Sequence, residues 1–503
     1  MTYREKFLAS EERAHYQNIA TKILREMNQL RSQVESSPTA PKRWIWELIQ
    51  NAKDVSILGR IGIKIEAELA GNKRHVTFKH NGQPFSAENI RFLIEQISSK
   101  DRKKDETGRS NTTGTFGTGF LTTHLLSEIV LVRGVAKEEG LEPRRFELLL
   151  DRSGFDLDAI TEAVTKAKTS VENLDDEPPY HQYVIGAFNT AFRYELADDT
   201  GINVAKAGLA DHDACMPYTL AFVSEIDTVE LPWRKYSLRE RRALLADGEV
   251  QIVSLTTENS QEKNRSASHL LAVSTNGLTT IAIPVELVGE RVSIMRPSQE
   301  VPRLFCDFPL LGTEDFPFPV IINNPNFNPT DARDGVFLTH TSRLDPQIDE
   351  NKQIIREALS LYLALLKRAS DDAWENLHFL AAVHPVPSDL KWVDSSWYKS
   401  EVLTPVRTAL LRMNIVRTAT GELHSILSPD GKKYIWFPSA ERKEIREKLW
   451  RCCSSWFPHQ LPRRTDVEVW HDLTWDECGE LTTGQLSEFV ESRGSLDALS
   501  KGL

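Results

Sequence analysis

The chain has 503 residues, a formal net charge of −11 at pH 7, 40% hydrophobic residues and 26% charged residues. This is the composition of a water-soluble protein with several domains, and no stretch approaches the ~20 apolar residues that span a bilayer. The acidic balance argues against non-specific nucleic-acid binding. The polar N-terminus and five irregularly spaced cysteines predict a cytoplasmic protein without a disulfide framework.

The first hundred residues show both helical and strand periodicity in their apolar residues. Spacing of three and four between apolar residues indicates helices, and strict alternation indicates strands. On this basis we expect helices at residues 3–35, 44–55 and 86–97, and strands at 60–69 and 74–80.

The segment that follows is polar, basic and glycine-rich, and it has no apolar period. Residues 98–120 are therefore expected to form a loop. After it, residues 121–126 predict the start of a helix and 127–134 a strand. Residues 156–181 look helical and then loop-like, and 183–196 predict another strand.

From about residue 215 the pattern becomes rich in strands. Two alternating runs flank Asn276-Gly277, which is a strong hairpin signal. Short apolar runs bounded by Pro and Gly follow at 302–311 and 316–324, and a long amphipathic helix is expected at 348–370.

These patterns divide the α+β chain into three parts: a domain at 1–210, a strand-rich α/β domain at 211–345, and a mixed, mostly helical region at 346–503. The third part holds eight of the eleven tryptophans. We expect them mainly in a compact core, and the alternative is a surface that binds a protein partner, because tryptophan anchors interfaces. The cysteines and histidines of this region lack the paired spacing of structural zinc, so buried thiols are expected instead of a metal site.

The helix at 44–55 carries an unusual polar stripe in an apolar setting. Glu47, Asn51 and Asp54 are spaced by four and three residues, which places them on one side of the helix. A phosphoryl-transfer site needs a carboxylate that orients water and an oxygen ligand for Mg²⁺, and the first two side chains provide them. Taken alone, a solvated or capping face is the simpler interpretation.

A second motif is the glycine loop TTGTFGTGF. Gly114, Gly117 and Gly119 let the backbone approach a ligand, and N–H groups at the start of a helix form an anion site. Basic residues such as Lys100 precede it, which suits a polyphosphate. By itself the motif equally describes a solvated glycine turn.

In combination, the motifs are much more specific. E-L-I-x-N-x-x-D, x-N-G-x-x-F and G-x-F-G-x-G-F occur in this order within about 75 residues. The chain thereby resembles the GHKL ATPase superfamily, and within it the sacsin-type, heat-shock-chaperone-like ATP-binding domain of prokaryotic proteins. The resemblance covers roughly residues 10–345. It implies a Bergerat-type α/β sandwich that binds ATP and Mg²⁺, followed by a second α/β domain.

The resemblance also implies roles for individual residues. Glu47 would be the general base, Asn51 the Mg²⁺ ligand, and residues 98–116 the lid. Arg333, in the loop NPTDARDG, would reach the terminal phosphate, and the alternative for it is a salt bridge to Asp331 or Asp334. The implied nucleotide-binding set is Asn51, Asp54, His80, Asn81, Gly82, Phe85, Lys100, Gly114, Thr115, Phe116, Gly117, Thr118, Gly119, Phe120 and Thr190.

One position departs from the family pattern. Where the superfamily usually has an acidic residue that accepts a hydrogen bond from the adenine amino group, this chain has His80, and Pro84 replaces the next glycine. A neutral imidazole accepts one hydrogen bond, and only in the right tautomer. Asn81 or a water molecule could substitute for it.

These expectations describe an ATPase switch. ATP and Mg²⁺ would order the lid, closure would change the interdomain angle or promote a homodimer, and slow hydrolysis would reset the protein. The alternative is a nucleotide-binding scaffold that barely hydrolyses. The resemblance points to antiviral defence or chaperone-like work. Nothing in the sequence resembles the phosphoacceptor helices of a histidine kinase or the DNA-cleaving domain of a topoisomerase.

Overall fold

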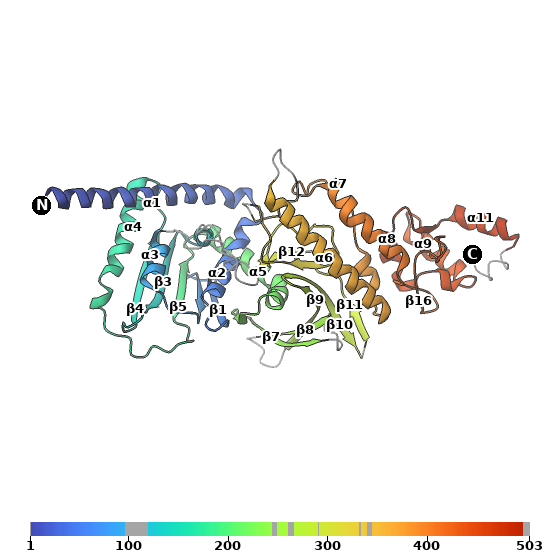
Figure 1. Ribbon diagram of the computed structural model, residues 1–503, viewed down its shortest axis with the longest axis horizontal. Helices are drawn as coiled ribbons and strands as arrows, with labels where there is room; N and C mark the ends of the chain where they lie inside the picture. Colours follow the sequence, from blue (N-terminus) through green and yellow to red (C-terminus); the bar gives the residue numbers. More distant parts are fainter. Residues whose placement is uncertain are drawn as a thin grey trace.

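A computed structural model of the chain describes residues 2–95, 119–243, 249–259, 266–289, 291–330, 333–339 and 345–495. The molecule is elongated, and its two termini lie at opposite ends (Figure 1). The fold is α+β, and a single mixed sheet of fourteen described strands runs through the first two parts of the chain.

The N-terminal part consists of an antiparallel sheet and helices packed against it. Its strands are β1 (Ile61–Glu68), β2 (His75–His80), β3 (Ile129–Ala136), β4 (Arg144–Asp151) and β5 (Thr190–Glu195), in the order β1-β2-β5-β3-β4. Its helices are α1 (Tyr3–Ser36), α2 (Arg43–Asp54), α3 (Ala87–Glu95) and α4 (Leu157–Glu172), with the 3-10 helices η1 (Ala40–Lys42), η2 (Phe120–Leu125) and η3 (Leu174–Asp176). Alternating burial along β4 shows that one face of this strand enters the core, and the first three residues of β1 are all buried.

Most of the expected elements of this part are confirmed, and two are corrected. Residues 121–126 form only a 3-10 helix, because Thr122 and Thr123 donate hydroxyl hydrogen bonds to carbonyls three residues earlier and compete with α-helical pairing. The strand expected at 183–196 begins only at Thr190, since residues 183–189 form turns. Strand β4 was not expected, although its sequence alternates.

The same sheet continues into the second part, because β6 (Ile226–Glu230) pairs in parallel with β1. The sequence boundary at 210 falls inside helix α5 (Asp199–Phe222). The remaining strands are β7 (Arg234–Ala243), β8 (Gln251–Asn259), β9 (Ser266–Asn276), β10 (Thr279–Val288), β11 (Arg291–Ile294), β12 (Leu304–Cys306), β13 (Phe308–Pro309) and β14 (Ile321–Asn323). The expected hairpin at Asn276-Gly277 is confirmed between β9 and β10, with Gly277 at a φ of +59°.

The third part is mostly helical, and α6 leads into it across β9 and β10 (Figure 1). Its helices are α6 (Pro346–Asp371), α7 (Ser395–Tyr398), α8 (Thr404–Arg412), α9 (Lys443–Cys453), α10 (Val467–Leu473) and α11 (Thr483–Arg493), with η4 (Leu377–Ala381), the π-helix η5 (Lys399–Leu403), η6 (Pro458–Gln460) and η7 (Arg464–Asp466). Its strands are β15 (Val416–Arg417), β16 (Leu423–His424), β17 (Trp436–Pro438) and β18 (Gly479–Leu481).

The tryptophans of this region belong to its interior. Trp374, Trp470 and Trp475 are buried, and the other five are half-buried. None of these eight side chains, all within the described residues, is exposed. The placement agrees with the expectation of a tryptophan-rich core.

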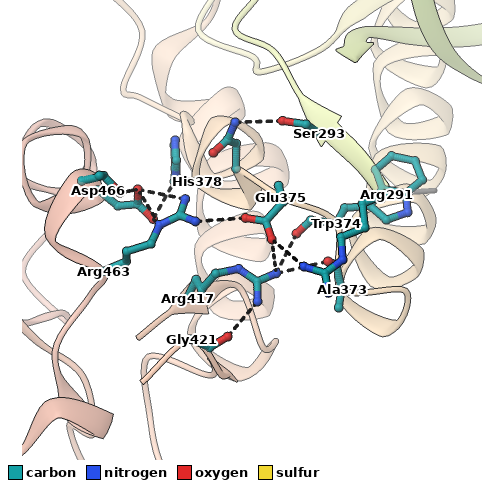
Figure 2. Close-up of polar contacts among 12 residues, drawn as sticks. Arg291, Ser293, Ala373, Trp374, Glu375, His378, Arg417, Gly421, Arg463 and Asp466 are labelled. Carbon is teal, nitrogen blue, oxygen red and sulfur yellow. Dashed lines mark hydrogen bonds and ion pairs between the residues drawn. The ribbon is translucent and has the colours of Figure 1, made fainter. Parts of the chain in front are cut away.

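A cluster of ion pairs joins the third part to the second. The Glu375 carboxylate lies 3.2 Å from an Arg417 nitrogen and 3.1 Å from an Arg463 nitrogen, and Arg291 of β11 approaches it at 3.8 Å. Arg463 also pairs with Asp466 (Figure 2). The Glu375 backbone also bonds β11, since its N–H donates to the Val292 carbonyl at 2.9 Å and its carbonyl accepts from the Ile294 N–H at 3.0 Å. These contacts hold this segment of the third part against β11.

Two further expectations concern metals and membranes. None of the five cysteines forms a disulfide; four are buried as expected, and Cys452 is exposed. Among the described residues no group of three His, Cys, Asp or Glu side chains could hold a metal ion. Within the same residues, no helix combines the length and apolar character needed to cross a bilayer.

Candidate functional site

Helix α2 is the centre of the candidate site. Its apolar side chains, including Trp44, Ile45 and Leu48, are buried against η2, α5 and the sheet. This packing fixes the position of the helix, and with it the backbone of Glu47 and Asn51. Glu47 is only 7% exposed, and Asn51, one turn later, is half-buried.

The Glu47 carboxylate has two arginine neighbours and one glycine neighbour. Oε1 lies 3.5 Å from Arg43 Nη2 and 3.8 Å from Arg333 Nη1. Burial lowers the pKa of Arg43, and the nearby Glu47 carboxylate acts in the opposite direction. On the other side, a Cβ atom added to Gly119 would lie 2.2 Å from Glu47 Oε2, so a larger residue at that position would displace the carboxylate.

Arg333 reaches this site from the second part of the chain. It stands in the loop between β14 and α6, with a φ of +54°, and its backbone N–H donates to the Thr330 carbonyl at 2.8 Å. Its guanidinium also donates to Gln50 Oε1 at 3.5 Å. Asp334, one proposed salt-bridge partner, instead accepts from the Thr330 hydroxyl at 2.6 Å, and Asp331 lies outside the described residues. The side chain therefore points to α2.

The other end of the site lies where β2 ends. His80 is directly opposite Thr190 of β5 in the strand register, so both side chains lie on one face of the sheet. The Gly82 N–H donates to His80 Nδ1 at 3.2 Å, and burial lowers the pKa of His80 to about 4. A Cβ atom on Gly82 would lie 2.7 Å from the carbonyl oxygen of Val55, so glycine lets this turn pack against the end of α2.

Two implied binding residues instead hold the backbone. The Gly62 N–H donates to Asn81 Oδ1 at 2.7 Å, so this amide oxygen already bonds the neighbouring strand. Phe85 packs edge-on against Phe146, with ring centroids 5.3 Å apart, and its backbone pairs with β3. Both residues therefore have structural contacts at the end of β2.

The remaining predicted residues fall into two groups. Phe120 is buried and its ring lies 5.5 Å from that of Phe192, at the start of η2. Asp54 is half-buried at the end of α2. Six positions of the implied set, together with the lid at 98–116, lie outside the described residues: Lys100, Gly114, Thr115, Phe116, Gly117 and Thr118.

The sequence did not predict three contributors to the site. Arg43 precedes Glu47 by four residues, a spacing that could have identified it as a partner. Gln50 and Lys53 gave no signal, because their partners come from the second part of the chain. The Lys53 ammonium pairs with Asp307 at 2.5 Å, and both side chains are at least 90% buried.

The residues at the centre of the site are compatible with Mg²⁺. Mg²⁺ takes few protein ligands and keeps waters and phosphate oxygens. Within the described chain the Asn51 side chain forms no hydrogen bond, so its amide oxygen can serve as one ligand beside Glu47. Arg43 and Arg333 would balance phosphate charge there.

Comparison with protein-family models gives no match for this chain. Comparison with curated protein sequences gives no match either. The assignment of a function therefore rests on the motifs and on the geometry of the site.

Proposed function

We propose that this chain binds a purine nucleoside triphosphate with Mg²⁺ and hydrolyses it slowly as a conformational switch. ATP is the nucleotide that the resemblance implies. The observation that carries the proposal is the meeting of Glu47, Arg333 and the glycine-loop end at Gly119. These residues come from three separate segments, and each supplies a function that phosphoryl transfer requires.

The chemistry follows from the positions of the side chains. Glu47 would accept a hydrogen bond from the attacking water and orient it, and Asn51 would hold Mg²⁺ against the phosphates. Burial strengthens these interactions because little water screens them. A Bergerat-type sandwich is the finer fold we propose, with the antiparallel sheet β1-β2-β5-β3-β4 behind α2.

Arg333 would link the nucleotide to the second part of the chain. Its 3.8 Å separation from Glu47 is long for an ion pair, and the side chain is 21% exposed. A terminal phosphate carries more negative charge than one carboxylate and would attract this guanidinium. Its movement would release Glu47 and shift the backbone at Arg333, and this would couple hydrolysis to interdomain motion. Nucleotide-dependent dimerisation belongs to the same proposal.

A scaffold that binds but does not hydrolyse is the second candidate. It is favoured by the engagement of Glu47 with two arginines, which would keep the carboxylate from water. For the biological role, antiviral defence or chaperone-like work in the cytoplasm is what the resemblance implies.

The test compares wild type with Glu47→Gln, which keeps the size of the side chain and removes the charge. We expect nucleotide binding by calorimetry to change less than about threefold and turnover to fall ~10²–10⁴-fold, as for loss of a general base. The matched control is Glu147→Gln, because Glu147 is 61% exposed and remote in the sheet order. Turnover of Glu47→Gln equal to wild type would refute the mechanism, and Mg²⁺-independent binding without turnover in wild type would favour the scaffold.

A further inference from the structure

The hydrogen bond at His80 determines which of its nitrogens carries the proton. Nδ1 accepts from the Gly82 N–H, so it has a free lone pair. A neutral imidazole has one donor and one acceptor nitrogen, and Nε2 must therefore be the donor. Burial keeps the ring neutral, since the pKa of His80 is lowered to about 4. Among the described residues no acceptor is found for Nε2, and this atom is not one of the fully buried side-chain atoms that lack a partner.

The ring is also held in place on several sides. Phe192 stacks on it with centroids 6.3 Å apart, and Phe78 of the same strand lies 6.4 Å away at a tilt. A reversal of the ring would lose the Gly82 hydrogen bond in a site that is 5% exposed, where an unpaired N–H costs roughly 1–3 kcal/mol. These contacts hold the His80 ring in one orientation, with Nδ1 on the Gly82 N–H.

The length of α2 between Glu47 and Val55 indicates that His80 lies at the end of the site where the nucleotide base would bind. Glu47 marks the phosphate end, and Gly82 packs against Val55, eight residues further along the chain. At a rise of 1.5 Å per residue this is about 12 Å, which is comparable with the length of an extended nucleoside triphosphate. A base lying against β2 would then meet Nε2.

We propose that His80 selects a 6-oxopurine, guanine or hypoxanthine, over adenine in the nucleotide site. The inference rests on the proposed nucleotide-binding function and specifies its base. A purine with an oxygen at position 6 presents an acceptor there, whereas adenine presents an amino donor. A donor against Nε2–H leaves two N–H groups unpaired in a buried site, and this mismatch disfavours adenine. An acidic residue in the same place would have the opposite preference.

The experiment measures binding of ADP, GDP and IDP to the full-length protein by calorimetry with Mg²⁺. IDP separates the effect of position 6 from that of the guanine 2-amino group. We expect GDP and IDP to bind at least about tenfold more tightly than ADP, which corresponds to the loss of one buried hydrogen bond. ADP binding that equals or exceeds IDP binding would overturn the inference while leaving the nucleotide site intact. Failure of all three to bind would instead reject the proposed function.

A variant provides an independent test. His80→Asp replaces the donor with an acceptor, and we expect the order of affinities to reverse in favour of ADP. His75→Asp, at the other end of β2, is the matched control and should keep the wild-type order. If His80→Asp does not fold, nitrogen NMR of labelled histidine in wild type identifies the protonated nitrogen of His80. Protonation at Nδ1 would overturn the inference, and protonation at Nε2 would support it.

Discussion

Gly119→Ala should slow hydrolysis while leaving the protein folded. The added Cβ atom would lie 2.2 Å from Glu47 Oε2, and ordinary contact begins at 3.4 Å, so the carboxylate must move by about 1.2 Å. The obstructing atom is the end of a flexible side chain, and the backbone at Gly119 is helical, with φ −57° and ψ −46°. Alanine is therefore tolerated by the backbone, and the free energy of unfolding should change by less than about 1 kcal/mol.

The rate should respond much more strongly than the stability. Displacement of a catalytic group by ~1 Å can cost ~10²-fold in rate, so we expect a fall of this size in single-turnover hydrolysis. Gly484→Ala is the control, since its nearest neighbour would lie at an ordinary 3.8 Å. Hydrolysis by Gly119→Ala within threefold of wild type, with the fold intact by thermal melting, would refute the assignment of Glu47 as the base.

The other predictions concern stability. Lys53→Met removes the cation that lies 2.5 Å from the buried Asp307 carboxylate, so urea unfolding should show a loss of roughly 3–5 kcal/mol. Adding Asp307→Asn should recover most of this loss, and no recovery would mean that the pair is not coupled. Gly208→Ala places a Cβ atom 2.2 Å from Nε1 of the fully buried Trp44. The free energy of unfolding should fall by about 1–3 kcal/mol. An unchanged free energy of unfolding would contradict this packing. Burial lowers the pKa of His212 from 6.5 to about 3, so its contribution to stability is complete above pH 6.5. As the pH falls from 6.5 towards 3 the unfolded chain takes up a proton that the folded one does not, and stability falls by about 1.4 kcal/mol per pH unit. Denaturation midpoints at pH 7 and pH 5.5 measure this, and His212→Phe should show a smaller difference between them; an equal difference would exclude His212 as the cause.

The sequence by itself determined the local elements of this protein. Apolar periodicity predicted α2 and the strands β1 and β2, because side-chain spacing follows directly from helix and strand geometry. It also placed Glu47 and Asn51 on one stripe, and Asn276-Gly277 in a hairpin. Where local hydrogen bonds compete, as in η2, the same reasoning predicted the wrong kind of helix.

Only the tertiary structure decided the pairing of Lys53 with Asp307 and the protonated nitrogen of His80. The pairing of Lys53 with Asp307 joins residues far apart in the chain, and no local pattern encodes it. The sequence identified His80 as unusual, but its donor nitrogen depends on the Gly82 N–H, which is a matter of backbone position. Contacts of this kind arise from tertiary packing. Burial and neighbouring hydrogen-bond donors determine which nitrogen of His80 carries the proton and where the Asp307 carboxylate lies, and the periodicity of the sequence contains neither.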